Sequence, residues 1–426
     1  MLGPVQKPTQ SWWLQNLEND DLPSPSTAPL PSSADIVVVG AGMTGCATAY
    51  WLKRLFGREC LVLDARGCAG GATGRNGGHL WGNPADAFQN ETAAEMLAFI
   101  EREGVACDLT VDGAVALERG SPEADVRYFD GTDDPEAKDD DEEWGEVAEW
   151  DQATCAARLQ TGSFSSAAHY SGAAQFYPAR VCAALLRHSG APLHVARVES
   201  LTTIADADTA HANTSGADAD ARPRVVVSTD VGAVRARHVV VATNAWCAEL
   251  LPELAPHSYP CRNQVIMTRP LPATSAWGVG AFSVDSDVGA RELYAIRRPD
   301  GRLCLGGVRA LEEDAAVGNA DDASLSDVVG GYLRTFLATH FPALGGVEVE
   351  AEWTGVLGFT RDGKPFVGPL PGRPGVLVAA CFCGHGMPQC FGVGKAVARM
   401  IEGGEHAEAV HPFIRDEASP ARVLGK

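Results

Sequence analysis

Residues 34–66 read ADIVVVGAGMTGCATAYWLKRLFGRECLVLDAR, and this stretch decides the fold. The apolar, β-branched run at 34–40 predicts a strand that is buried on both faces. Residues 43–57 carry apolar side chains at helical spacing, and residues 60–66 form a second apolar run. A strand, a glycine turn, a helix and a second strand together predict a βαβ unit built on a parallel sheet.

The turn in this unit carries a G-x-G-x-x-G pattern at Gly40, Gly42 and Gly45. In a βαβ unit the first glycine makes a tight turn, the second lets the backbone approach a pyrophosphate, and the third lets helix and strand pack closely. Asp64, at the end of the second strand, takes the place of a ribose-binding acid. The pattern indicates an adenine dinucleotide without separating NAD from FAD, and the alternative is a merely tight strand–helix turn.

A second glycine-rich segment, CAGGATGRNGGHLWG at 68–82, follows directly. A nicotinamide-binding domain normally continues into further βαβ units, whereas a flavin dinucleotide needs protein wrapped along its whole length. We therefore expect these glycines to let the loop lie against a diphosphate, a ribityl chain and a ring edge. Arg75 would supply a permanent positive charge to the diphosphate; the alternative is an ordinary surface arginine.

At this point the sequence resembles the FAD-dependent oxidoreductases of the D-amino-acid oxidase and sarcosine oxidase superfamily, in particular the γ-glutamylputrescine-oxidase-like branch. The resemblance covers nearly all of residues 34–404. It rests on VVVGAGMTGCATAYWL, VLDAR, GATGRNGGH, QFYPARVCAALL, HVVVATNAW and WTGVLGFTRDGKPFVGPLPGRPGVLVAACFCGHGM. The fold it implies is α/β, a two-domain flavoprotein with a Rossmann-like FAD-binding domain and an antiparallel-sheet substrate (cap) domain.

The resemblance implies a set of cofactor-binding residues. The first βαβ unit would contribute its turn and the end of its second strand, the second glycine-rich segment would line the diphosphate and ring, Val198 would offer backbone on the adenine side, and the last turn would face the pyrimidine edge. In order, these residues are Gly40, Gly42, Met43, Thr44, Gly45, Asp64, Ala65, Arg66, Ala72, Thr73, Gly74, Arg75, Asn76, Gly77, Gly78, Val198, Gly384, His385, Gly386 and Met387.

The same resemblance implies oxidation of a C–N single bond, with hydride transfer to the flavin, an imine product, and oxygen as the expected acceptor giving hydrogen peroxide. On the substrate side we expect His79, Tyr294, Arg298 and Trp353, with Arg298 a candidate clamp for a substrate carboxylate. The alternative for Arg298 is a solvent-facing hairpin arginine, and for Trp353 a core tryptophan. Gln264 is a further candidate.

Two departures from the family pattern bear on the chemistry. Some sarcosine oxidases attach FAD through a cysteine before the C-terminal signature, but EWTGVLGFTRDG has none, so we expect noncovalent FAD. Those enzymes also place a lysine near the flavin, where this sequence aligns Cys304, which leaves oxidase against dehydrogenase open. Other readings are a tailoring oxidoreductase of secondary metabolism acting on a non-amine substrate, and a noncatalytic flavoprotein or NAD-binding module.

The predicted domains are discontinuous. We expect a flexible N-terminal arm at 1–33, an FAD-binding domain from 34–95, 170–262 and 350–404, a substrate domain from 96–169 and 263–349, and a C-terminal tail at 405–426. Within them we expect helices at 91–108 and 177–190, one strand at 192–204, antiparallel strands at 262–271, 292–307 and 347–360, and a strand running into a glycine turn at 375–387.

Composition limits the partners. The chain has 34 basic and 55 acidic residues and a net charge of −21, which disfavours nucleic acid and anionic membranes. Much of the acidity lies at 130–146, where we expect a solvated loop or insertion. At 205–222 we expect a disordered, low-complexity loop. Twelve scattered cysteines, with no apolar leader or spanning run, predict reduced thiols and a cytoplasmic protein. The motif Cys381-x-Cys383-x-His385 lacks a fourth ligand, so we expect no metal there. The partner that we expect is a small molecule, which the resemblance implies to be an amine.

Overall fold

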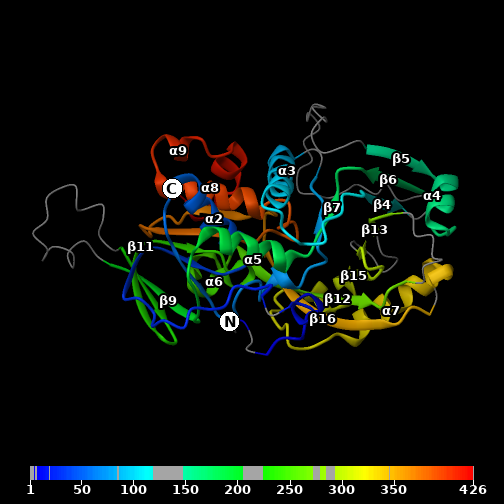
Figure 1. The fold of residues 1–426 in the computed structure, drawn as a ribbon, viewed down its shortest axis with the longest axis horizontal. Coiled ribbons are helices and arrows are strands. Elements are labelled where there is room, and N and C mark those ends of the chain that lie inside the picture. Colours follow the sequence, from blue (N-terminus) through cyan, green and yellow to red (C-terminus); the bar gives the residue numbers. More distant parts are fainter. Residues whose placement is uncertain are drawn as a thin grey trace, which may run out of the picture.

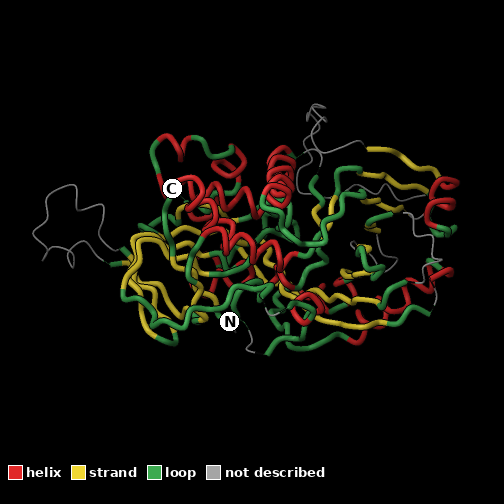
Figure 2. The backbone as a smooth tube through the Cα atoms, in the orientation of Figure 1, coloured by secondary structure: helices red, strands yellow, loops and turns green. Residues whose placement is uncertain are grey.

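The computed structural model describes residues 4, 7–18, 20–83, 86–118, 147–204, 224–271, 279–284, 293–344 and 346–425. The acidic run at 130–146 and the loop at 205–222 lie outside these residues. The molecule has two lobes side by side (Figure 1). Helices gather on the first lobe, whereas the second is mostly strand (Figure 2). The chain is therefore an α/β protein, and the predicted class is confirmed.

The first lobe is built on an eight-stranded sheet. Six strands follow the order β17-β18-β11-β1-β2-β8; of the other two, β10 pairs with β11 and β9 pairs with β10. The pairs that join β18, β11, β1, β2 and β8 are all parallel. The strands are β1 (Ser33–Val39), β2 (Leu61–Asp64), β8 (Leu193–Val195), β9 (Val198–Thr203), β10 (Val225–Thr229), β11 (Gly232–Val241), β17 (Phe366–Pro369) and β18 (Val376–Ala380). The single strand expected at 192–204 is two strands, because β8 pairs with β2 whereas β9 turns away to pair with β10.

The central strand β1 is buried on both faces, as its unbroken apolar run predicts. Ile36 and Val38 face the layer that contains the long helices. Val37 and Val39 face a second core formed with β9, β10 and β11. Successive side chains of a strand point to opposite faces, so one apolar run serves two cores.

Helices α2 (Met43–Phe56), α5 (Pro178–Ser189) and α8 (Cys390–Glu402) cover one face of this sheet. Gly57 and Gly190 end α2 and α5 in the left-handed conformation, with φ of 63° and 66°. The helix expected at 91–108 is α3 (Ala87–Arg102). It begins earlier because the Asp86 side chain caps it, accepting a hydrogen bond from the Gln89 N–H at 3.0 Å.

The second lobe is an eight-stranded sheet with the order β16-β12-β15-β14-β13-β4-β6-β5. Among the described strand pairs of this sheet, β13 and β4 form the one parallel pair. One face packs on α7 (Asp327–His340), through Phe282 and Leu305; the other face, with Val265 and Ile296, joins the core of the first lobe. The strands are β4 (Ala114–Glu118), β5 (Val147–Asp151), β6 (Ser166–Tyr170), β12 (Ser258–Thr268), β13 (Ala281–Val284), β14 (Leu293–Arg297), β15 (Leu303–Gly307) and β16 (Val349–Thr360).

A two-stranded ribbon and several short helices complete the described structure. The ribbon pairs β3 with β7, and the domain boundary expected at 262/263 lies inside β12. The remaining β-strands and α-helices are β3 (His79–Leu80), β7 (Ala174–Gln175), α1 (Trp12–Gln15), α4 (Gln152–Leu159), α6 (Cys247–Leu250), α9 (Glu405–Glu408) and α10 (Ala421–Leu424).

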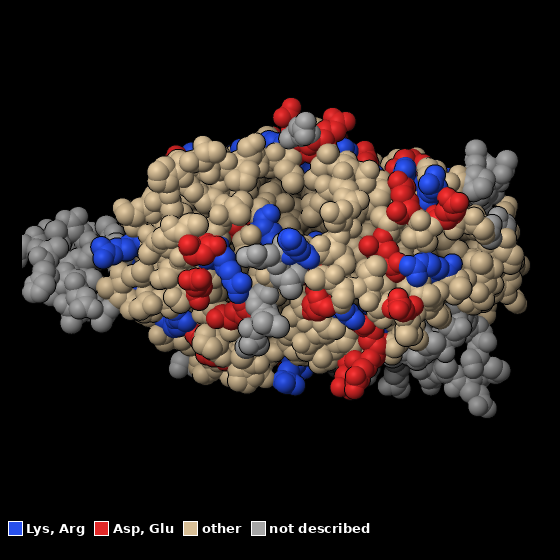
Figure 3. Space-filling view, turned by 90° about the horizontal axis from the view of Figure 1, so that it is seen from below, with Lys and Arg blue, Asp and Glu red and all other residues tan. Residues whose placement is uncertain are grey.

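The N-terminal segment is docked on the body of the protein. Trp12 and Trp13, in α1, are 5% and 1% exposed, and both belong to the core of the first lobe. Figure 3 looks at the side of the molecule on which this segment runs in Figure 1; on that face Lys and Arg side chains lie singly among Asp and Glu.

Candidate functional site

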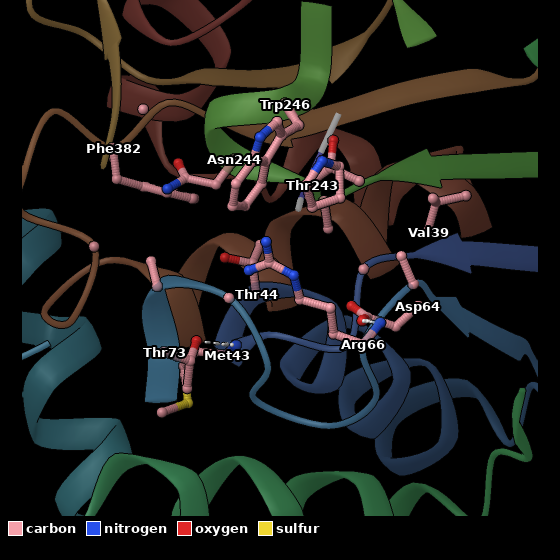
Figure 4. A pocket seen from close by; sticks show the side chains of 18 of the residues that line it. Val39, Met43, Thr44, Asp64, Arg66, Thr73, Thr243, Asn244, Trp246 and Phe382 are labelled. Carbon is pink, nitrogen blue, oxygen red and sulfur yellow. Dashed lines mark hydrogen bonds between the residues drawn. The ribbon is translucent and has the colours of Figure 1, made fainter. Parts of the chain in front are cut away.

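A cavity opens where the parallel strands of the first sheet end. The carboxyl ends of β1, β2, β11 and β18 meet at one edge, which is where open α/β sheets bind ligands. In Figure 4, Asp64 and Arg66 lie across this cavity from Thr243 and Trp246. Its lining consists of Pro4, Val39, Gly40, Met43, Thr44, Leu63, Asp64, Ala65, Arg66, Gly71, Ala72, Thr73, Asn76, Ala196, Arg197, Val198, Ala242, Thr243, Asn244, Trp246, Glu249, Leu250, Leu357, Gly358, Phe382, Gly384, Gly386, Met387 and Cys390.

The three glycines of the first turn have different surroundings. Gly40 lines the cavity and has φ of 112°, and a Cβ there would lie 2.5 Å from the Ala242 carbonyl oxygen. Gly42 and Gly45 stand behind the lining. A Cβ on Gly45 would lie 1.8 Å from the Gly40 carbonyl oxygen, so this glycine permits the close approach of α2 to β1.

The N-terminus of α2 borders the cavity through Met43 and Thr44. The Met43 N–H donates to the Thr73 hydroxyl at 2.8 Å, which ties the second glycine-rich segment to the start of this helix. Ala72 and Thr73 also line the cavity. Free N–H groups and the helix dipole make such a helix start favourable for an anion.

Asp64 lines the cavity at the end of β2. One carboxylate oxygen accepts from the Ala41 N–H at 2.8 Å, and the other from the Arg66 and Gly67 N–H groups at 2.7 and 2.9 Å. Burial raises the pKa of Asp64, and these three hydrogen bonds oppose the shift. A carboxylate offers about four acceptor positions. The three bonds therefore leave room for about one ribose hydroxyl rather than both.

The guanidinium of Arg75 does not face the cavity. Arg75 is 4% exposed; its Nη1 donates to the Thr354 carbonyl oxygen at 2.8 Å, and its Nε lies 4.0 Å from an Asp322 carboxylate oxygen. Burial lowers the pKa of Arg75 to about 10, with Asp322 opposing the shift. Arg66, by contrast, lines the cavity; it binds Asp322 at 2.7 and 3.0 Å and lies 5.2 Å from the Trp246 ring.

Most glycines of the second glycine-rich segment are approached by this chain itself. Asn76 lines the cavity, whereas Gly74, Gly77 and Gly78 do not. A Cβ on Gly77 would lie 2.7 Å from the Tyr294 ring, and one on Gly74 would lie 2.9 Å from the Leu14 side chain. Close packing between segments therefore accounts for these three glycines, and their contact with a ligand stays a prediction.

Later parts of the chain also line the cavity. They include Val198 at the start of β9, and Gly384, Gly386 and Met387 in the C-terminal turn. Met387 accepts a hydrogen bond on sulfur from the Asn76 amide at 3.3 Å, which joins the C-terminal turn to the second glycine-rich segment. His385 is exposed, stands outside the lining, and has its Nδ1 3.1 Å from the Cys383 carbonyl oxygen.

Sequence reasoning missed the residues that follow β11. Thr243, Asn244 and Trp246 line the cavity, as does Phe382 after β18. Asn244 is left-handed, with φ of 47°, and its side-chain oxygen accepts from the Cys381 N–H at 2.9 Å. The signal was present in ATNAW, a small polar turn at the carboxyl end of a parallel strand, where ligand-binding residues collect.

None of the four substrate-side candidates lines this cavity. Trp353 is fully buried, and its Nε1 donates to the Arg75 carbonyl oxygen at 2.9 Å. His79 lies on β3 with its Nε2 buried and without a hydrogen-bond partner, and burial lowers its pKa to about 4. Gln264 is also buried; its amide nitrogen donates to Glu352 at 2.7 Å, and its amide oxygen accepts from the Ser326 N–H at 2.7 Å.

Tyr294 lies beside the second glycine-rich segment, against Gly77. Arg298 lies farther along the same sheet and is 5% exposed. Its guanidinium donates to Asp108 at 2.7 Å and lies 4.8 Å from a Trp13 ring. It is not the solvent-facing arginine considered as the alternative, and the groups around it are protein carboxylates and aromatic rings.

Three thiols gather behind the first glycine turn. Among the described residues, Cys46, Cys68 and Cys182 form the one group of three or more Cys, His, Asp or Glu whose ligand atoms all lie within 4.8 Å of one another. The thiols of Cys46 and Cys182 are directed at the Ala41 carbonyl oxygen, at 3.5 and 3.4 Å. The cysteine–histidine motif at 381–385 does not converge in this way, and the expectation that no metal is bound stays a prediction.

The lining fits a phosphate- and sugar-containing ligand such as FAD. The Thr243 hydroxyl and the Trp246 indole nitrogen are buried and have no hydrogen-bond partner. Both residues border the cavity, together with the N-terminus of α2 and the remaining acceptor position of Asp64. Buried polar groups are normally hydrogen-bonded, so these atoms indicate a polar occupant.

Comparisons with known proteins agree with this geometry. At 27% identity over 399 residues, the chain is similar to gamma-glutamylputrescine oxidoreductase of Escherichia coli (strain K12), covering 87% of this chain and 84% of that protein. The fold is similar to glycine oxidase from Geobacillus kaustophilus, with a TM-score of 0.66, 20% identity, and 91% and 98% of the two chains covered. It is also similar to an L-amino acid deaminase from Proteus vulgaris, with a TM-score of 0.71, 18% identity, and 93% and 96% covered.

None of the described helices is long and apolar enough to cross a bilayer.

The sequence profile described as "DAO: FAD dependent oxidoreductase" matches residues 35–400, which span both lobes. The resemblance inferred from the glycine turns and the C-terminal signature is thereby confirmed. The chain belongs to the DAO family of FAD-dependent oxidoreductases.

Proposed function

We propose that the chain binds FAD noncovalently in this cavity and oxidises the C–N bond of a small amine to an imine, with oxygen as acceptor and hydrogen peroxide as second product. The observation that carries the proposal is a cavity at the carboxyl ends of four parallel strands in a chain of this family. When bound, FAD supplies the hydride acceptor. The chain's own residues bind it, orient it and exclude water.

Each part of the lining has a proposed role. Asp64 would accept a ribose hydroxyl, and Val198 would lie on the adenine side. The N-terminus of α2, with Thr73, would hold the diphosphate. Asn76 and Met387, which are hydrogen-bonded to each other, would border the ring. All of these residues line the cavity, and the roles are those that the family resemblance implies for them.

Noncovalent attachment is supported by the state of Cys390, the one cysteine among the lining residues. Cys390 lines the cavity, and burial raises its pKa to about 12. Cys304, the residue aligned with the family lysine, is fully buried, and burial raises its pKa to about 12 as well. A protonated thiol is a poor nucleophile. All twelve cysteines are free, which is typical of the cytoplasm, the compartment we propose.

The surroundings of Arg298 favour an amine over an amino acid. Arg298 was the candidate clamp for a substrate carboxylate, but its guanidinium is held by Asp108 and by the rings of Trp12 and Trp13. Near the proposed ring position, the lining residues Asn76, Leu357, Phe382 and Met387 carry no charge. Relatives that cover most of the chain are named both for gamma-glutamylputrescine and for glycine, so the preference for an amine rests on the residues of this chain.

The test uses matched substrates. The flavin of the purified protein should absorb at about 450 nm. If the FAD is noncovalent, acid precipitation of the protein should release the colour into the supernatant. Anaerobic addition of putrescine or cadaverine should bleach the flavin band more than ornithine or lysine, which are the same amines with a carboxylate added. Readmitted oxygen should restore the colour and produce peroxide. A colourless protein that does not take up FAD would overturn the proposal. Bleaching of the flavin by non-amine compounds alone would overturn the C–N oxidation and indicate an FAD-dependent oxidoreductase that acts on a non-amine substrate.

A further inference from the structure

The N-terminal strap, defined here as Pro4 and residues 7–14, runs along the cavity and the second glycine-rich segment. It forms the dark blue trace near the N-terminus, beneath the junction of the two lobes (Figure 1). Pro4 lines the cavity, and α1 begins at Trp12. The family profile matches residues 35–400, so the strap precedes the matched region.

The strap is hydrogen-bonded to the backbone of the second glycine-rich segment. The Ser11 hydroxyl donates to the Gly74 carbonyl oxygen at 2.5 Å, and the Trp13 indole N–H donates to the Asn76 carbonyl oxygen at 2.6 Å. Asn76 is a cavity-lining residue. Two donors of the strap therefore fix backbone oxygens on both sides of Arg75, next to the proposed cofactor.

The same segment makes room for the strap by lacking side chains. A Cβ on Gly74 would lie 2.4 Å from the Ala69 carbonyl oxygen and 2.9 Å from the Leu14 side chain. One on Gly78 would lie 2.7 Å from the Phe176 carbonyl oxygen and 3.1 Å from the Trp13 ring. Gly78 has φ of 81°, which favours glycine independently. Two of the glycines in this segment thus accommodate the strap.

A second anchor ties the strap to the other lobe. The Thr9 N–H donates to the Asp322 carbonyl oxygen at 2.7 Å, and the Thr9 hydroxyl accepts from the Thr354 N–H at 2.9 Å. Arg75 Nη1 also donates to that hydroxyl, at 3.3 Å. The strap therefore joins β16, the loop before α7 and the second glycine-rich segment at one place.

We propose that the N-terminal strap is a positioning element that holds residues 70–78 in the conformation required to bind FAD. The strap acts through the backbone of Gly74 and Asn76 rather than by touching the reacting atoms. The inference rests on the proposed placement of FAD in this cavity. An FAD titration of the intact apoprotein tests that placement by itself, so the two proposals fail separately.

The first experiment uses single variants of the full chain. Trp13→Phe keeps a ring but removes the donor to Asn76, and Ser11→Ala removes the donor to Gly74. Each should weaken FAD binding about tenfold, because the apoprotein can then populate other conformations of residues 70–78 and only a fraction of it is ready to bind. Ser11→Thr, which keeps the hydroxyl, should bind FAD as the unchanged protein does. Gln15→Ala, an exposed change on the same helix, is the control. Flavin fluorescence gives the dissociation constant, and the shape of the bound flavin's visible band reports its surroundings.

Thermal unfolding of the apoproteins separates positioning from general stability. The positioning role requires weaker FAD binding and a changed band while the apoprotein Tm moves by no more than about 2 °C. If FAD affinity falls only in proportion to apoprotein stability, the strap is merely structural and the proposal is overturned.

A second experiment restores the strap in trans. The chain lacking residues 1–15 should bind FAD weakly, and a synthetic peptide of residues 1–17 should restore binding, whereas the same peptide with Trp13→Ala should not. Wild-type FAD affinity and an unaltered visible band in the truncated chain would overturn the inference. If the truncated chain fails to fold, the single variants decide.

Discussion

The carboxylate of Asp322 lies between two guanidinium groups and is 0% exposed. Arg66, which follows β2, binds it with both terminal nitrogens, and Arg75 approaches it from the second glycine-rich segment. Asp322 itself belongs to the loop before α7. One buried carboxylate therefore pairs with two guanidinium groups and connects the two lobes beside the proposed cofactor cavity.

Replacing this carboxylate should be costly. We expect Asp322→Asn to lower the free energy of unfolding by about 3–5 kcal/mol, because removing one partner leaves buried charge without compensation. Urea denaturation of the apoprotein measures the change. The exposed pair of Arg415 and Asp416 supplies the control, and Asp416→Asn should produce no measurable difference. A loss below about 1 kcal/mol for Asp322→Asn would show that the two arginines find other partners.

At the scale of elements, glycine serves different purposes in two helices. Gly45, in the first turn of α2, allows that helix to lie against the end of β1. Gly331, in α7, has no heavy atom within 4 Å of the position its Cβ would take. The same substitution should therefore have opposite effects at the two sites.

We expect Gly45→Ala to destabilise the protein by about 3 kcal/mol or more, because the added methyl would overlap a backbone carbonyl that has nowhere to move. Gly331→Ala should stabilise it by about 0.5–1 kcal/mol, because alanine restricts the unfolded chain and favours helix. Chemical denaturation of both variants checks the pair. Equal effects of the two substitutions would contradict the packing described for the β1–α2 turn.

At the scale of the whole molecule, the two sheets meet along a buried seam. β3 and the second glycine-rich segment lie in it, and His79 contributes an imidazole there whose pKa burial lowers to about 4. A histidine in an unfolded chain has a pKa of about 6.5. Between these values the unfolded chain binds a proton that the folded protein does not, so stability falls as the pH is lowered through this window. His238, whose pKa burial also lowers to about 4, has the same sign.

The substitution His79→Gln tests this linkage. It should cost less stability at pH 4.5 than at pH 7, by about 2–3 kcal/mol, because at the lower pH the unchanged protein has already lost that amount. Urea denaturation at the two pH values gives the difference. His406→Gln, an exposed change, should shift the unfolding free energy equally at both. An identical cost of His79→Gln at the two pH values would show that the imidazole is not kept neutral in the seam.

The sequence predicted the site best where its parts are close along the chain. The turn at Gly40, the end of β2 at Asp64 and the start of α2 are fixed by a strand–turn–helix pattern, and all of them border the cavity. It was less informative where a turn has no glycine pattern. Asn244 and Trp246 follow β11 in a small polar turn without a glycine pattern, and the turn becomes informative once β11 is placed as a parallel strand that ends at the cavity edge.

The sequence by itself determined the βαβ unit, the family and the cavity edge, because these depend on spacing within short stretches and on the direction of parallel strands. Tertiary structure alone decided that Arg75 is paired with Asp322, that Arg298 is enclosed by Asp108 and aromatic rings, and that the N-terminal strap packs on Gly74 and Gly78. Arg66 and Asp322 are 256 positions apart. Contacts between residues so far apart in the sequence depend on how the two lobes pack together, and the spacing of residues along the chain does not predict that packing.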